Sequence, residues 1–201
     1  MNSIKYLLVF HGYFDNIVNI NHNRSMSTNK YIHTKIENLR ARYYSYLSGR
    51  ESLVKLLSQA EVSEQVYNSN AIENSTLTLE DTERILLQLD LDRYVSGREI
   101  FEAKNLARVT EYVENKAGQA DLNHEIILFL HKILLANIND NVAGRFRQAG
   151  EYVRVGSHIA PAPEMIQKLL TGALNEYQGS YGENIISRIA RLHLRFENMH
   201  R

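Results

Sequence analysis

Apolar residues recur at three- and four-residue steps through most of this chain, and that period constrains the fold more than any other feature. The spacing is that of one face of an α-helix. It begins near residue 31 and continues, with short breaks, to the end of the chain. The first helical segment ends near Gly49 and has its apolar residues at Ile32, Ile36, Leu39, Tyr43 and Leu47. The period predicts an all-α fold.

Capping signals mark where several of these helices begin. Ser96 followed by Glu99 has the spacing of a capping box, and Thr78 followed by Asp81 is a weaker version of it. We expect Asp121 to cap the helix that follows it. Pro163 suits the first turn of another helix, and the last helix is expected from about residue 183 to the chain end.

One passage between the helices has a different pattern. The β-rich run Tyr152, Val153, Arg154 and Val155 is followed by Gly156 and Ser157. Two short runs joined by such a pair are typical of a β-hairpin. The sequence therefore predicts an all-α fold with one short β-hairpin.

The bulk composition excludes several classes of protein. The 201 residues hold 23 Lys and Arg against 23 Asp and Glu, so no net charge favours nucleic acid or an anionic membrane. No apolar run reaches the roughly 20 residues that span a bilayer. The absence of cysteine fits a cytoplasmic protein and excludes disulfides and thiolate metal sites.

Residues 1–28 differ from the rest and are expected to be a poorly ordered tail. They carry three charged residues and show no sustained period. The apolar run from Ile4 to Phe10 is short and lacks a small-residue cleavage site, which argues against a signal peptide. Met26 precedes the first patterned segment, so translation starting at either Met1 or Met26 fits the sequence.

The terminal helix carries apolar residues over much of its circumference, which predicts a central, buried helix. Its penultimate residue is His200. A histidine at the junction of such a helix with a loop suits a general base, because its unperturbed pKa of about 6.5 lies near operating pH. Without that context, His200 would be expected to be an exposed surface residue.

The same helix resembles one found in Fic (Fido-domain) proteins, whose pattern is A-x-x-H-x-x-F-x-x-I-H-P-F-x-D/E-G-N-G-R. Ala190, His193, Phe196, Met199 and His200 match, and Arg201 stands in place of the proline. The resemblance implies an N-terminal helical region over 29–120 and a partial, incomplete Fido domain over 121–201. It also implies AMP transfer from ATP, with magnesium, to a hydroxyl of a protein target. His200 would act as the base and His193 would be structural.

Two further segments resemble Fic features in the expected order. Ser69, Glu73 and Asn74 match the inhibitory motif S/T-x-x-x-E-G/N, in which the glutamate restrains the nucleotide. Serine and glutamate four residues apart share one helical face. Residues 143–147 (A-G-R-F-R) resemble the stretch before the family's flap, and Tyr152–Val155 would be the flap that binds the target as an added strand. An ordinary covering hairpin explains the run equally well.

The 201 residues contain no phosphate-binding loop, neither G-x-x-x-x-G-K-S/T nor G-x-G-x-x-G nor the G-N-G-R of the family. We therefore expect a truncated relative of the adenylyltransferases that is inactive alone. The alternatives are a non-catalytic, helical protein-interaction module and the relic of an interrupted gene. His124 and His131 lie seven residues apart, yet no carboxylate or histidine completes a metal site.

Overall fold

A computed structural model describes residues 26–116, 119, 121–180 and 183–200. Within these residues the regular elements are helices and one minimal pair of strands, so the all-α prediction is confirmed. The elements in chain order are α2 (Met26–Leu47), α3 (Glu51–Ile72), α4 (Leu79–Leu86), α5 (Gly97–Lys116), α6 (His124–Leu135), β1 (Arg154–Val155), β2 (His158–Ile159), α7 (Pro163–Gly179) and α8 (Ile185–His200).

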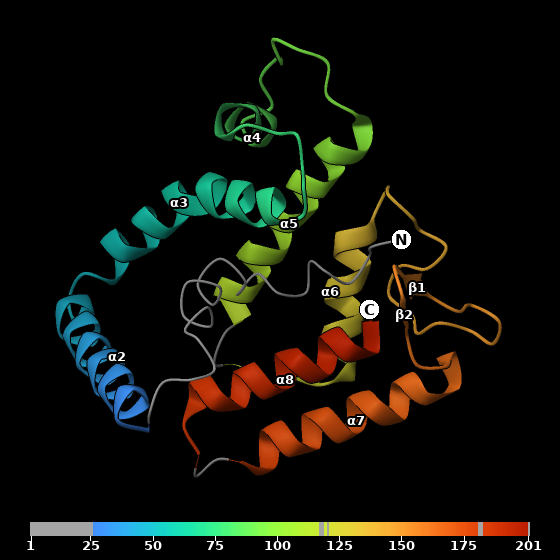
Figure 1. Cartoon of the computed structure of the whole chain (residues 1–201). Coiled ribbons are helices and arrows are strands. Elements are labelled where there is room, and N and C mark those ends of the chain that lie inside the picture. The colour runs from blue at the N-terminus through green and yellow to red at the C-terminus, as the bar shows by residue number, and fades with distance from the viewer. Residues whose placement is uncertain (1–25, 117–118, 120, 181–182, 201) are drawn as a thin grey trace.

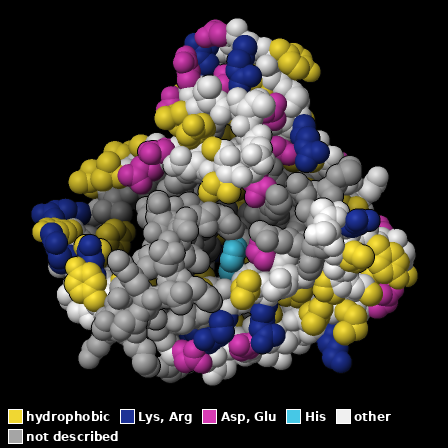
Figure 2. All heavy atoms as spheres, in the orientation of Figure 1, with side chains coloured by type: hydrophobic (Ala, Val, Ile, Leu, Met, Phe, Trp, Pro, Cys, Tyr) yellow, Lys and Arg dark blue, Asp and Glu magenta, His cyan; other side chains and the backbone are white. Residues whose placement is uncertain are grey.

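The helices form two groups that share α6. In the first group α3, α4 and α5 pack on one another and α6 packs on α5; in the second, α7 and α8 lie side by side (Figure 1). Helix α2 lies at the edge of the molecule (Figure 1). Basic and hydrophobic side chains gather over that edge in Figure 2, and Leu39 and Tyr43 are among the exposed residues of α2.

Two hydrophobic cores follow from this arrangement, and α6 contributes to both. Its Leu130 and Leu134 belong to the first core, whereas its Ile127 belongs to the second. The predicted division at residue 120 falls just before this shared helix. The first core holds Val66, Leu77, Ile85, Val95, Ala103, Leu106 and Val109 besides the two α6 residues, and the second holds Leu170, Ala173, Leu174 and Met199 besides Ile127.

The prediction that the terminal helix is central and buried is wrong for the described residues. Helix α6 has that position, whereas α8 lies on α7 with one face toward the second core. Leu194 of α8 is 61% exposed. Arg191 and Arg195 of α8 pair with Glu176 of α7, so the charged residues of α8 also lie beside its neighbour. The distribution of apolar residues around this helix therefore did not predict whether it is fully buried or packed on one side only.

Three helix starts follow the predicted chemistry and one does not. Thr78 and Asp81 form a reciprocal capping box at α4, and Pro163 lies in the first turn of α7. The Glu99 amide donates to Ser96 Oγ at 3.2 Å. At α6, however, Asn123 is the cap, because its Oδ1 accepts from the Ile126 amide at 2.9 Å. The assignment of this cap to Asp121 was wrong by two residues.

The carboxyl ends of α6 and α7 are held by donors from neighbouring helices. Asn105 of α5 is fully buried, and its Nδ2 donates to the carbonyls of Leu134 and Ala136 at 3.1 and 2.8 Å. Arg188 of α8 donates through Nε and Nη2 to the Tyr177 carbonyl of α7 at 3.1 and 2.6 Å. These bonds satisfy carbonyls that a helix end leaves without an intrahelical partner.

Helix α3 ends in a Schellman motif that requires an unusual backbone at Asn74. The Asn74 amide donates to the Ala71 carbonyl at 3.1 Å, and the Ser75 amide donates to the Asn70 carbonyl at 3.1 Å. Asn74 has φ of 63°, in the left-handed region that glycine and asparagine adopt most readily. The G/N position of the Ser69–Asn74 motif therefore has a structural reason of its own.

The amino-terminal tail was predicted to cover residues 1–28. Residues 1–25 lie outside the described part of the chain, while Met26–Thr28 form the first turn of α2. Among the described residues, no helix is both long enough and apolar enough to cross a membrane.

We predict that Asn74→Ala lowers the free energy of unfolding by about 1 kcal/mol, because a Cβ-bearing residue without a polar side chain is disfavoured in the left-handed region. Asn74→Gly should leave stability nearly unchanged. Urea denaturation measures both. Asn68→Ala, at an exposed position of the same helix, is the control. Equal stability of the two Asn74 variants would contradict the assignment.

Candidate active site at the carboxyl end of helix α8

Helix α8 begins at an asparagine cap and ends at the candidate base. The Asn184 Oδ1 accepts from the Ile186 amide at 2.9 Å, in the first turn of α8. His200 is the last helical residue, and its side chain lies outside the described part of the structure. Met199 before it is buried in the second core. The structure thus describes the backbone that carries His200, while the catalytic role of its ring stays a prediction.

Arg147 contacts this helix end directly. Its Nη2 donates to the Met199 carbonyl at 3.2 Å and to the Pro161 carbonyl at 3.0 Å. Burial lowers the pKa of the Arg147 guanidinium, and the nearby Glu151 carboxylate opposes that shift. The contact joins the helix end to the segment that follows the hairpin. Sequence reasoning placed Arg147 in a family-like stretch without giving it a role.

The loop that carries Arg147 is braced by a bidentate ion pair. Arg145 Nη1 and Nη2 each donate to a Glu151 carboxylate oxygen at 2.7 Å, and the Gln148 amide donates to the same carboxylate at 2.6 Å. The Arg145 bonds, and after them the Gln148 amide, lower the pKa of Glu151 to about 2. Seven residues are therefore closed into one turn immediately before the hairpin.

The other end of this loop is held by a buried histidine. His131 of α6 is 5% exposed, and its Nδ1 accepts from the Gly144 amide at 3.0 Å. Burial, followed by the Arg145 charge, lowers the pKa of His131 from 6.5 to about 4. Gly144 has φ of 74°, and a Cβ there would lie 2.9 Å from Lys132 Cβ. The glycine of the A-G-R-F-R stretch thus permits the close approach of this loop to α6.

The hairpin is shorter than the sequence predicts. Its register pairs Arg154 with Ile159 and Val155 with His158, and the Ala160 amide donates to the Val153 carbonyl at 3.0 Å. The Ala160 bond is the last of this ladder, and Tyr152 lies outside the strand. The side chains of Val155 and His158 lie outside the described part of the chain. Tyr152 and Ile159 are 65% and 67% exposed.

The inhibitory motif occupies the end of α3. Ser69 is half-buried in the last turn, Glu73 is the first residue after the helix and Asn74 is the left-handed residue described above. The segment just beyond is bonded to α5, since Thr76 donates through its amide and its hydroxyl to Glu99 Oε1 at 3.0 and 2.6 Å. The restraint of the nucleotide by Glu73 stays a prediction.

The two histidines that share a face of α6 do not form a metal site. His124 Nε2 lies 3.3 Å from Thr171 Oγ1, and its ring packs edge-on against Phe146, whereas His131 faces Gly144. No group of three potential His, Cys, Asp or Glu ligands occurs among the residues that the structure describes.

Comparisons with known proteins found similarity to Fic proteins. Residues 121–201 match the Fic/DOC family. The chain is 29% identical over 160 residues to a protein named protein adenylyltransferase Fic from Nematostella vectensis. That match covers 77% of this chain and 36% of the relative, so the chain spans about a third of the length of the curated protein it matches.

A solved structure has a similar fold. A Fic family protein from Desulfovibrio desulfuricans G20 superposes with a TM-score of 0.62, covering 89% of this chain and 53% of that one. The sequence identity is 23%, so this likeness concerns the fold alone. Together with the sequence match, it supports a Fic-like arrangement of the helices and a distant similarity to protein adenylyltransferases.

The buried His131 gives the protein a predictable pH dependence. Its folded pKa of about 4 lies below the unfolded value of 6.5, so the unfolded chain binds more protons between these values. The contribution of His131 to the free energy of unfolding is full above pH 6.5. It falls by roughly 3 kcal/mol as the pH drops from 6.5 to 4.

His131→Asn tests this, because Oδ1 of asparagine can accept from Gly144 and does not titrate. Urea denaturation at pH 7.5, 6.5, 5.5 and 4.5 should give a flatter profile for the variant than for the parent protein. Parallel profiles would show that His131 is not the group responsible.

Proposed function

We propose that this chain supplies the general base, the inhibitory helix end and the target-binding flap of a Fic-type protein adenylyltransferase. Its reaction is the transfer of AMP from ATP to a protein hydroxyl. The observation that carries the proposal is the Fic/DOC match over residues 121–201, which includes the helix ending at His200. The proposal also divides the chain into an N-terminal helical region over 29–120, which carries the inhibitory segment, and the Fic/DOC region over 121–201.

His200 accepts the proton of the target hydroxyl in this proposal. A neutral imidazole is well matched to that task near pH 7. The buried Met199 and the Arg147 bond support the role, because they hold the adjacent backbone in place. A base acts efficiently only when its geometry is maintained by neighbouring groups.

The residues present do not fit the nucleotide and magnesium that the family generally uses. The described residues offer no cluster of three acidic or histidine ligands. The 201-residue sequence has no glycine-rich phosphate loop. In this proposal the chain supplies the base, the flap and the restraining Glu73, and we expect the 201-residue polypeptide by itself to transfer no AMP.

The hairpin is proposed to bind the target protein. The exposed side chains of Tyr152 and Ile159 flank a ladder of very few backbone bonds. An extended segment of a target could add to the free edge of such a hairpin through its own backbone groups. Glu73, with Ser69 in the preceding turn, is proposed to restrain the nucleotide, and Asn74 ends their helix.

A labelled-ATP transfer assay tests the base. The 201-residue polypeptide alone is expected to give no labelling. A chimera extended after Met199-His200 by a segment with the family's P-F-x-D/E-G-N-G-R sequence is expected to label protein. His200→Ala in that chimera should reduce the rate by about 10²- to 10⁴-fold, the usual contribution of a general base.

The matched control is His193→Gln, which replaces the other histidine of α8. This variant should retain labelling. Labelling by the polypeptide alone that depends on His200 would contradict the expected inactivity. Labelling by the chimera that persists in His200→Ala would contradict the base assignment.

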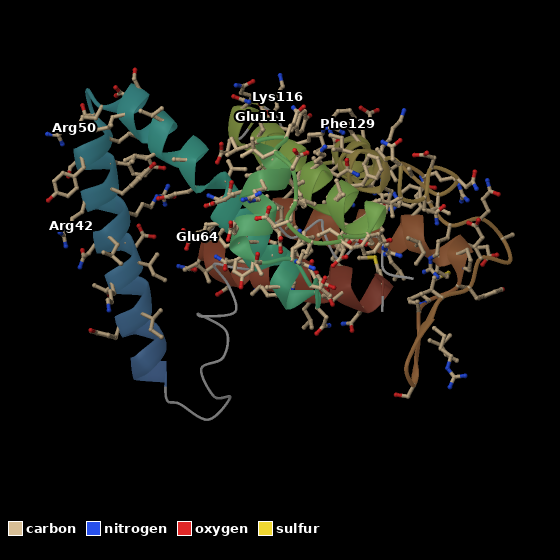
Figure 3. The ribbon with its side chains drawn as sticks, turned by 90° about the horizontal axis from the view of Figure 1, so that it is seen from above. Arg42, Arg50, Glu64, Glu111, Lys116 and Phe129 are labelled. Carbon is tan, nitrogen blue, oxygen red and sulfur yellow. The ribbon has the colours of Figure 1, made fainter. Side chains whose placement is uncertain are left out.

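The inhibitory role is tested in the same chimera. Glu73→Gln removes the charge that would pair with an arginine of the phosphate loop, so AMP transfer should rise by about fivefold or more, as is typical of coupling between sites. The control is Glu64→Gln, at an exposed residue of α3, the helix that Glu73 follows (Figure 3). This variant should leave the rate unchanged. An equal rise in both variants would argue against the assignment of Glu73.

A further inference from the structure

Arg147 connects two segments that are distant in sequence and meet beside the candidate base. One guanidinium nitrogen, Nη2, donates both to the Met199 carbonyl of α8 and to the Pro161 carbonyl after β2. Met199 directly precedes His200, and Pro161 directly follows the last hairpin bond, at Ala160. The contact therefore joins the end of the helix to the base of the hairpin.

The physical chemistry of a helix end explains why a cation suits this position. The last carbonyls of α8 have no partner within the helix, and they carry the negative end of its dipole. A guanidinium presents several N–H groups in a fixed plane, so it can bond two carbonyls at once. Arg147 satisfies the Met199 carbonyl in this way.

The position of Arg147 is itself determined on both sides. Gly144, three residues before it, is bonded to His131 of α6, and Phe146 packs against the second core. Four residues after it, Glu151 closes the loop through its ion pair with Arg145. The guanidinium thus transmits the position of a braced loop to the helix end.

The second terminal nitrogen of Arg147 argues against a purely stabilising role. Its Nη1 is buried and has no hydrogen-bond partner among the described residues. A buried N–H group without a protein partner costs stability. A residue that contributes stability alone would be better replaced by one without such a cost.

We infer that Arg147 is a positioning residue. By bonding the carbonyls of Met199 and Pro161, it sets the place of the His200 backbone relative to the hairpin. A displacement of the hairpin, for instance by a bound target segment, is transmitted to the helix end through this side chain. The catalytic meaning of this contact rests on the proposed function, while the contact itself does not.

The test uses the full 201-residue chain without nucleotide. The Cε1–H resonance of the His200 ring, assigned by its loss in His200→Ala, reports the surroundings of the base. Arg147→Met should shift or broaden that resonance, and amide exchange at residues 196–199 should accelerate by about tenfold. Arg98→Met, the same substitution in α5, removes an exposed ion pair with Glu102 and lies outside the loop that carries Arg147, so it should leave both readouts near those of the parent.

Arg147→Lys keeps the charge and should move the His200 resonance back toward its parent position. If Arg147→Met fails to fold, the same two measurements on Arg147→Lys provide the test. A His200 resonance that is unchanged in both folded Arg147 variants would overturn the proposal, as would an equal effect of Arg98→Met. Because no transfer is measured, absence of AMP transfer would count against the proposed function and leave this result unaffected.

Discussion

The carbonyl groups at the carboxyl ends of α6, α7 and α8 have no partner within their own helices, and the arrangement of the C-terminal half depends on how they are satisfied. At each of the three ends, at least one donor belongs to another element. Asn105 of α5 bonds the end of α6, Arg188 of α8 bonds the end of α7, and Arg147 bonds the end of α8. If a helix held this way slid along its neighbour, a buried carbonyl would lose its hydrogen bond. Such a loss costs roughly 1 to 3 kcal/mol.

These contacts bring the candidate site together from parts that are separate in the sequence. Helix α6 packs into both cores, and its His131 holds the loop that carries Arg147. That loop leads into the hairpin on one side and touches the end of α8 on the other. The surroundings of the proposed base are therefore a consequence of packing around α6. The end of α3, with Glu73, belongs to the first group of helices and is bonded to α5.

The sequence predicted the helices better than it predicted their packing. Periodicity located the helical segments, and the capping box at Thr78 was recognised, because both signals are local. The central position of α6 instead of α8 depends on contacts between helices, which periodicity does not contain. At the hairpin, the end of the ladder at Val153 and Ala160 could be located only once the register was known. The contact of Arg147 with Met199 joins residues 52 positions apart, so no local pattern could indicate it. The assignment of His200 as the base rests on its motif and stays a prediction.

The central claim of the proposed function is that His200, at the end of α8, acts as the general base of AMP transfer and that Glu73, at the end of α3, restrains the nucleotide. A crystal structure of the chain extended by the family's phosphate loop, with a non-hydrolysable ATP analogue bound, tests this most directly. The account predicts that the His200 ring faces the α-phosphate, that the Glu73 carboxylate lies beside the arginine of the loop, and that Arg147 remains bonded to Met199. A His200 ring directed away from the analogue, or a nucleotide bound far from both residues, would contradict it.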